Sequence, residues 1–133
     1  MNRQGIYQEV NRLWWLLRGT YAVAFIGSGL DKYVHVLVDW YAQGIPAFCC
    51  ACGISQESML CVRSIAEVLI GICLCTPMVR TSAYAAALWL VLSAVYVFMV
   101  PGHIDTGMRY TVIALGAYTL ARLTVLKKEV ELP

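Results

Sequence analysis

Long runs of apolar residues alternate with short polar breaks along this chain. Four runs approach the about 20 residues that a membrane-crossing helix needs. They cover approximately residues 11–30, 59–76, 82–100 and 108–126. This pattern predicts an all-α fold, namely an integral membrane four-helix bundle in which residues 1–133 form a single membrane domain.

The breaks between the runs carry residues that stop or turn a helix. Pro77 follows the second run and Pro101 follows the third, at positions where a proline sharply ends a helix. Gly107 marks the expected turn before the fourth run. These breaks support short connections between the second, third and fourth spans.

A different pattern follows the first run, in the segment GSGLDKYVHVLVDW. Between residues 30 and 41, apolar side chains recur at helical spacing, whereas Asp31, His35 and Asp39 recur every fourth residue on another face. This is an amphipathic pattern with the period of an α-helix. We expect the first span to leave the membrane near Asp31 and to turn into a short interfacial helix over residues 31–42.

The composition supports a membrane protein and limits the kinds of partner to be expected. Hydrophobic residues make up 60% of the chain and charged residues 14%, against about 25% charged in an average soluble domain. The net charge of +2 is too small to indicate a nucleic-acid partner. The expected partners are therefore the lipid bilayer and other membrane protein subunits.

The distribution of basic residues predicts the orientation. An even number of spans puts both termini on one side, and seven basic residues fall on that side against three on the other. By the positive-inside rule, both termini are expected in the cytoplasm, with the protein in a bacterial inner membrane. The seven are Arg3, Arg12, Arg18, Arg80, Arg122, Lys127 and Lys128, and the three are Lys32, Arg63 and Arg109.

Two charges interrupt the second span, Arg63 and Glu67, and their spacing of four residues places them on one helix face. Charges inside a span are costly and usually face the bundle interior. Gly71 continues this face and would let another helix come close. Two interpretations stay open: Glu67 binds a ligand or handles a proton, or it forms a structural ion pair with Arg63 or with Arg109.

Eight titratable residues fall toward the outer half of the predicted bundle, and we call them the outer polar set. They are candidates for ligand binding or for a structural polar lock, and no catalytic residue is assigned. A metal site is not predicted, because His35 and His103 have no ligand-spacing motif. The set consists of Asp31, Lys32, His35, Arg63, Glu67, His103, Asp105 and Arg109.

Four of the six cysteines fall on the expected outer side: Cys49, Cys50, Cys52 and Cys61. They permit three complete disulfide pairings, between which the sequence does not choose. A redox-active role would require an exposed thiolate of low pKa. A structural disulfide or buried free thiols are the simpler interpretations.

Three segments resemble the DoxX-like family of small four-helix membrane proteins: LLRGTYAVAFIGSGLDKY, IAEVLIGICL and GMRYTVIALGAYTLARL. The resemblance covers roughly residues 13–124. The family's Gly-x-x-Lys near the end of the first span corresponds to residues 29–32. Its Glu followed by Gly in the second span corresponds to Glu67 and Gly71, and its polar start of the fourth span to Asp105 and Arg109.

The resemblance implies one class of function, and the residues themselves favour another. The family includes the small membrane subunit of a thiosulfate:quinone oxidoreductase, which implies a quinone-linked membrane redox subunit with a non-covalently bound quinone. The main hypothesis from the residues is a small accessory subunit of a larger membrane protein complex. In that case the polar residues of the outer half hold the bundle together, and no cofactor is required.

Overall fold

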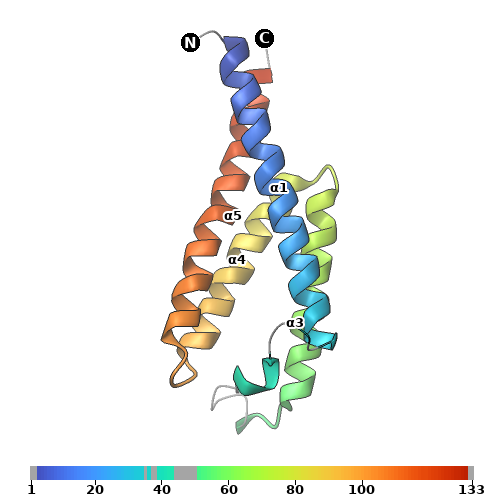
Figure 1. Ribbon diagram of the computed structural model, residues 1–133, viewed down its shortest axis with the longest axis vertical. Helices are drawn as coiled ribbons and strands as arrows, with labels where there is room; N and C mark the ends of the chain where they lie inside the picture. Colours follow the sequence, from blue (N-terminus) through green and yellow to red (C-terminus); the bar gives the residue numbers. More distant parts are fainter. Residues whose placement is uncertain (1–2, 35, 37–38, 44–50, 132–133) are drawn as a thin grey trace.

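The computed structural model describes residues 3–34, 36, 39–43 and 51–131. These residues form an all-α fold with four α-helices: α1 (Arg3–Val34), α3 (Gln56–Cys75), α4 (Val79–Phe98) and α5 (Ile104–Glu131). A short 3-10 helix, η1 (Trp40–Gln43), lies between α1 and α3. The helices make an elongated bundle with both chain ends at one end (Figure 1). The prediction of an all-α, four-helix fold is confirmed.

The end of the first helix differs from the prediction. α1 continues through Asp31 and Lys32 to Val34, so a helix end near Asp31 and a separate helix starting there are wrong. The reason is that both side chains are buried and find partners inside the bundle. His35, with residues 37–38 of the predicted interfacial helix, lies outside the described residues.

The turn before the last helix is also displaced. Gly107 lies inside α5, which begins at Ile104, and it packs against Phe98, whose ring would clash with a larger side chain there. The turn is made instead around Gly102, whose φ of 88° lies in the left-handed region.

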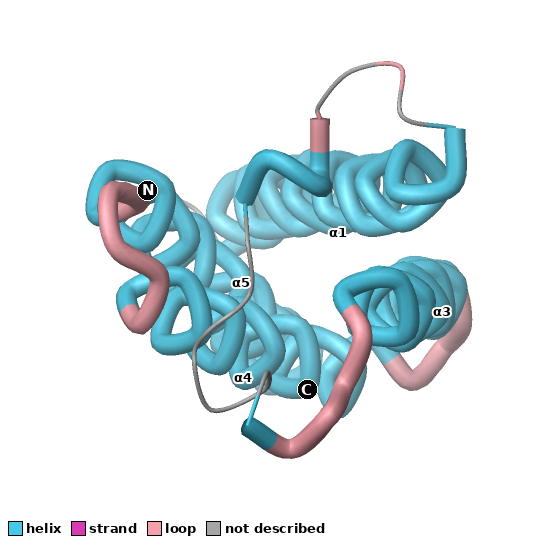
Figure 2. The backbone as a smooth tube through the Cα atoms, turned by 90° about the horizontal axis from the view of Figure 1, so that it is seen from below, coloured by secondary structure: helices cyan, strands magenta, loops and turns pink. Residues whose placement is uncertain are grey.

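The bundle is built from two closely packed helix pairs, α1 with α3 and α4 with α5. Figure 2 looks along the bundle and shows α3 beside α1, with α4 and α5 on the other side. Small side chains bring α4 and α5 together. Completely or almost completely buried alanines on these two helices are Ala83, Ala86, Ala117 and Ala121.

Two glycines set the close approach of α1 and α3. A Cβ atom on Gly71 would lie 3.0 Å from the backbone nitrogen of Ile26. One on Gly29 would lie 3.0 Å from the carbonyl oxygen of Ser64. The predicted role of Gly71, to let another helix come close, is confirmed. The close approach at Gly29 and Gly71 brings the polar side chains of α1 and α3 within hydrogen-bonding distance.

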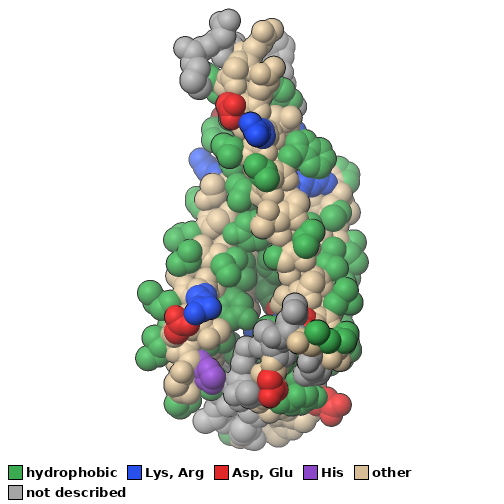
Figure 3. Space-filling view, viewed as in Figure 1, with side chains coloured by type: hydrophobic (Ala, Val, Ile, Leu, Met, Phe, Trp, Pro, Cys, Tyr) green, Lys and Arg blue, Asp and Glu red, His purple; other side chains and the backbone are tan. Residues whose placement is uncertain are grey.

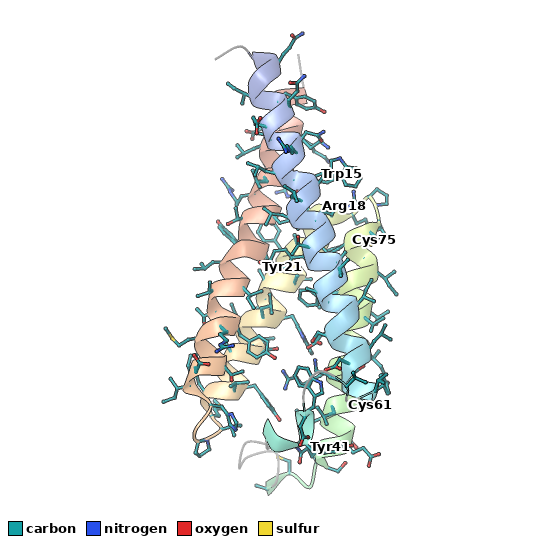
Figure 4. All side chains as sticks on the ribbon, in the orientation of Figure 1. Trp15, Arg18, Tyr21, Tyr41, Cys61 and Cys75 are labelled. Carbon is teal, nitrogen blue, oxygen red and sulfur yellow. The ribbon has the colours of Figure 1, made fainter. Side chains whose placement is uncertain are left out.

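Arg18 joins the same two helices at the other end of α3, beside Cys75 (Figure 4). Its guanidinium donates hydrogen bonds to the last carbonyl groups of α3, which have no partner within the helix. A cation at a helix C-terminus also interacts favourably with the helix dipole. The acceptors are the carbonyl oxygens of Leu74, Cys75 and Thr76, at 2.8, 2.7 and 3.1 Å.

Two aromatic side chains of α1 reach α5. Trp14 Nε1 donates to Thr124 Oγ1 at 2.8 Å, and the Tyr21 hydroxyl donates to the carbonyl oxygen of Ile113 at 2.6 Å. These bonds satisfy the polar atoms of otherwise buried rings. They tie the α1–α3 pair to the α4–α5 pair.

We predict that Gly71→Ala lowers the free energy of unfolding by about 1–3 kcal/mol, because the added methyl group meets α1 backbone and overpacks the interface. The matched control is Gly27→Ala on α1, where a Cβ meets nothing within 4 Å. The control should be neutral or slightly stabilising, since alanine favours helix. Thermal unfolding in detergent, followed by circular dichroism, measures both. Equal stability of the two variants would contradict the close packing at Gly71.

Candidate functional site

A buried ion pair between Lys32 and Glu67 lies where α1 and α3 meet, toward the end opposite the termini. Lys32 Nζ is 2.5 Å from Glu67 Oε2, and the two residues are 3% and 5% exposed. Ser28, one turn before Lys32, donates its hydroxyl to the same carboxylate oxygen at 2.9 Å and accepts from Lys32 Nζ at 3.1 Å. Glu67 is therefore held by two side chains of α1.

Aromatic side chains cover both members of the ion pair. Lys32 Nζ lies 4.0 Å from the centre of the Trp40 ring, a cation–π contact. On the other side, Trp89 Nε1 of α4 donates to Glu67 Oε1 at 3.5 Å. The pair is thus shielded from solvent and also contacts the second helix pair.

Asp31 is buried beside Lys32 and organises the end of α1. Its carboxylate accepts a hydrogen bond from Trp40 Nε1 at 2.8 Å and one from the backbone N–H of Val36 at 3.2 Å. These bonds place the Trp40 ring over the Lys32 ammonium. Asp31 therefore positions the aromatic cover of the ion pair.

Arg63 is the fourth buried charge, one turn before Glu67 on α3 and 7% exposed. Its guanidinium carbon lies 4.9 Å from the centre of the Tyr96 ring on α4. The Tyr110 hydroxyl of α5 is a neighbour of the Arg63 side chain. The Nη2 atom of Arg63 is buried without a hydrogen-bond partner among the described residues. We call Asp31, Lys32, Arg63 and Glu67 the buried cluster.

The structure divides the outer polar set. Asp31, Lys32, Arg63 and Glu67 come together, whereas Asp105 and Arg109 form an exposed ion pair of their own at 2.8 Å on α5. His103 is half-buried in the turn before α5, and His35 lies outside the described residues. No group of three His, Cys, Asp or Glu residues within the described part of the chain could hold a metal ion.

The partner predicted for Glu67 is wrong. Instead of Arg63 or Arg109, the carboxylate pairs with Lys32, because α1 packs directly on α3 through Gly29 and Gly71. Arg63 turns toward Tyr96, and Arg109 is on the surface. The aromatic residues of the site were not among the residues predicted from the sequence. Trp89 and Tyr96, seven residues apart, share one face of α4, and this spacing was the available signal.

A cavity of about 380 Å³ adjoins the ion pair at the end opposite the termini. It is lined by Lys32, Tyr33, Tyr41, Glu57, Ser58, Leu60, Cys61 and Ser64. Figure 4 shows Cys61 and Tyr41 at this end of the bundle. The Cys61 sulfur lies 3.5 Å from the Tyr33 hydroxyl oxygen. Cys52 and Cys61 are exposed free thiols, and Cys49 and Cys50 lie outside the described residues.

No family model matches the chain, and neither a curated protein nor a solved structure matches it. The resemblance to the DoxX-like family therefore rests on the sequence motifs alone.

We predict that Lys32→Met and Glu67→Leu each destabilise the protein by about 3–5 kcal/mol, because either change leaves an unpaired charge in the bundle. The double variant should lose clearly less than the sum of the two single losses, since it removes both charges. Thermal unfolding in detergent provides the measurement.

The control pair is Arg109→Met and Asp105→Asn, which breaks an exposed ion pair and should leave stability unchanged. Additive losses at Lys32 and Glu67 would show that the two side chains act independently, contrary to the structure.

Proposed function

We propose that the protein is an integral membrane protein in which all four helices cross the bilayer. One observation carries this proposal: four charged side chains lie inside the bundle, whereas many large apolar side chains lie outside. The four residues of the buried cluster are 3–7% exposed, whereas Val23 of α1 and Val112 of α5 are 73% and 65% exposed. Soluble proteins distribute these residue types in the opposite way. A bilayer favours charges that face the bundle interior.

α3 and α4 are long and apolar enough to span a membrane. Only 28% and 39% of their most apolar windows are buried, whereas the core helix of a soluble protein would be mostly buried. α1 and α5 do not pass the same test, yet both carry outward apolar side chains. These are Leu13, Trp15, Leu16, Val23 and Leu30 on α1, and Met108, Val112, Ile113, Leu115, Tyr118 and Leu126 on α5.

The charge of Arg18 is compatible with a span in α1. Its three hydrogen bonds to the end of α3 satisfy a guanidinium that lipid could not solvate. The proposed location is a bacterial inner membrane with both termini in the cytoplasm, as the basic residues favour. The buried cluster then lies in the outer half.

We assign the protein the role of a small accessory subunit of a larger membrane complex. The Lys32–Glu67 ion pair supports this role, because each of its charged groups is already bonded to groups of the chain itself. Such a pair fixes the arrangement of α1 and α3. The outward apolar faces of the four helices then remain available to lipid and to neighbouring subunits.

A quinone-linked redox subunit is the second candidate. The observation that favours it is the aromatic environment of Arg63 and Glu67, formed by Trp89, Tyr96 and Tyr110. Aromatic rings stack on a flat quinone ring, and a guanidinium donates to its carbonyl oxygen. The resemblance to the DoxX-like family also favours a quinone-linked redox subunit.

Reporter fusions test the proposed orientation, in which both termini lie in the cytoplasm. A fluorescent protein fused after residue 131 should fold and fluoresce, since it fluoresces in the cytoplasm and not after export. Alkaline phosphatase fused at the same point should be inactive, whereas a fusion in the turn at Gly102 should be active. Active phosphatase at the C-terminus would overturn the orientation, and release of the unfused protein by alkaline carbonate would overturn the membrane assignment.

Purification in a mild detergent separates the two roles. An accessory subunit should co-purify with other membrane subunits in a fixed ratio, and its own preparation should contain no quinone. Extraction and chromatography of bound quinone give the second measurement. Stoichiometric quinone in the isolated protein, lost in a Trp89→Leu variant, would favour the redox subunit instead.

A further inference from the structure

Two cations, Lys32 and Arg63, and two carboxylates, Asp31 and Glu67, are buried toward the end of the bundle opposite the termini. Lys32 contacts Glu67 Oε2, which also accepts from Ser28, and the other oxygen of Glu67 faces Trp89 Nε1. Arg63 is one turn away on α3 and makes no ion pair with any described residue. Among the described residues, no carboxylate therefore lies at ion-pair distance from Arg63.

One nitrogen of the Arg63 guanidinium, Nη2, also lacks a hydrogen-bond acceptor among the described residues. Arg63 is only 7% exposed, and its Nη2 has no hydrogen-bond partner among the described residues. An arginine in a protein keeps its positive charge, because the guanidinium is not deprotonated under ordinary conditions. A buried charge normally obtains both a partner and hydrogen bonds. The Nη2 group of Arg63 is thus a donor that no described residue uses.

The surroundings of Arg63 belong to three helices. Tyr96 of α4 lies against the guanidinium at 4.9 Å, and the Tyr110 hydroxyl of α5 is within reach of the same charge. The face in Figure 3 is hollowed between the α1–α3 pair and the α4–α5 pair. The site is thus a junction between the two pairs, where a ligand would contact both.

We infer that Arg63 anchors an internal oxyanion site between the two helix pairs, which binds a small ligand carrying a phosphate, sulfate or carboxylate group. The planar donor fork of a guanidinium matches the spacing of oxygens in these groups. One oxygen of the ligand accepts from Arg63 Nη2, and the negative charge of the ligand faces a guanidinium that forms no ion pair with a described residue. The Tyr110 hydroxyl is a further donor for the same ligand.

This inference rests on the four-helix fold and not on the accessory role, because it concerns the isolated protein. The oxyanion has two possible sources, a free anion or the phosphate group of an anionic lipid. The experiment therefore has one arm for each source, and failure of subunit co-purification would not affect either arm.

In the first arm, inorganic phosphate is titrated into the protein in a neutral detergent, at constant ionic strength kept with sodium chloride. We expect a saturable rise of the unfolding temperature, read from tryptophan fluorescence. Arg63→Met should raise the half-saturating phosphate concentration at least about tenfold, as loss of a charged hydrogen bond does. Arg63→Lys keeps the charge without the fork and should bind with intermediate strength.

In the second arm, the protein is placed in nanodiscs of phosphatidylcholine with a minor share of phosphatidylglycerol, and retained lipid is measured by native mass spectrometry. Arg63-dependent retention of phosphatidylglycerol identifies the lipid as the source. Arg109→Met is the control for both arms, because Arg109 is exposed and paired with Asp105. The control should behave as the wild type.

Absence of a saturable response to phosphate, together with absence of selective lipid retention in the wild type, overturns the site. So does a response that persists unchanged in both Arg63 variants. Should Arg63→Met fail to fold, Arg63→Lys decides: a weaker response than the wild type supports the site, and an equal response rejects it.

Discussion

The ion pair of Lys32 and Glu67 is the interaction on which the arrangement of this bundle depends. Two charges that are 3% and 5% exposed are stable only when they meet at hydrogen-bonding distance. This requirement fixes the register of α1 on α3. It also explains why α1 continues to Val34, since a helix that ended before Lys32 would not deliver the ammonium group to the carboxylate.

The ion pair in turn requires the two glycines. Gly29 and Gly71 remove the side chains that would hold α1 and α3 apart, and the Ser64 hydroxyl donates to the carbonyl oxygen of Gly29 at 2.6 Å in the gap that results. At the other end of α3, Arg18 closes the same interface through backbone carbonyl groups. The α4–α5 pair is different, because small alanines and apolar contacts hold it together. Polar contacts thus contribute to the α1–α3 interface, whereas close packing of small side chains joins α4 and α5.

Arg63 stands at the junction of these two kinds of packing. It lies on the α1–α3 pair, yet it turns toward Tyr96 of the α4–α5 pair, and its Nη2 has no partner among the described residues. A structural ion pair and a ligand site are therefore adjacent on one face of α3, one turn apart. The ion pair explains how the bundle accommodates buried charges, and the proposed ligand would bind the donor that no described residue uses.

The sequence by itself determined the number of long helices and their approximate positions, because the length of apolar runs and the prolines between them depend only on local order. It also marked Asp31, Lys32, Arg63 and Glu67 as unusual, since charges in apolar segments need an internal partner. It did not determine which charge meets which. Glu67 pairs with Lys32, 35 residues away, and the nearer Arg63 lies beside Tyr96. Spacing along a helix defines a face, but only the packing of α1 against α3 and α4 decides what each face meets.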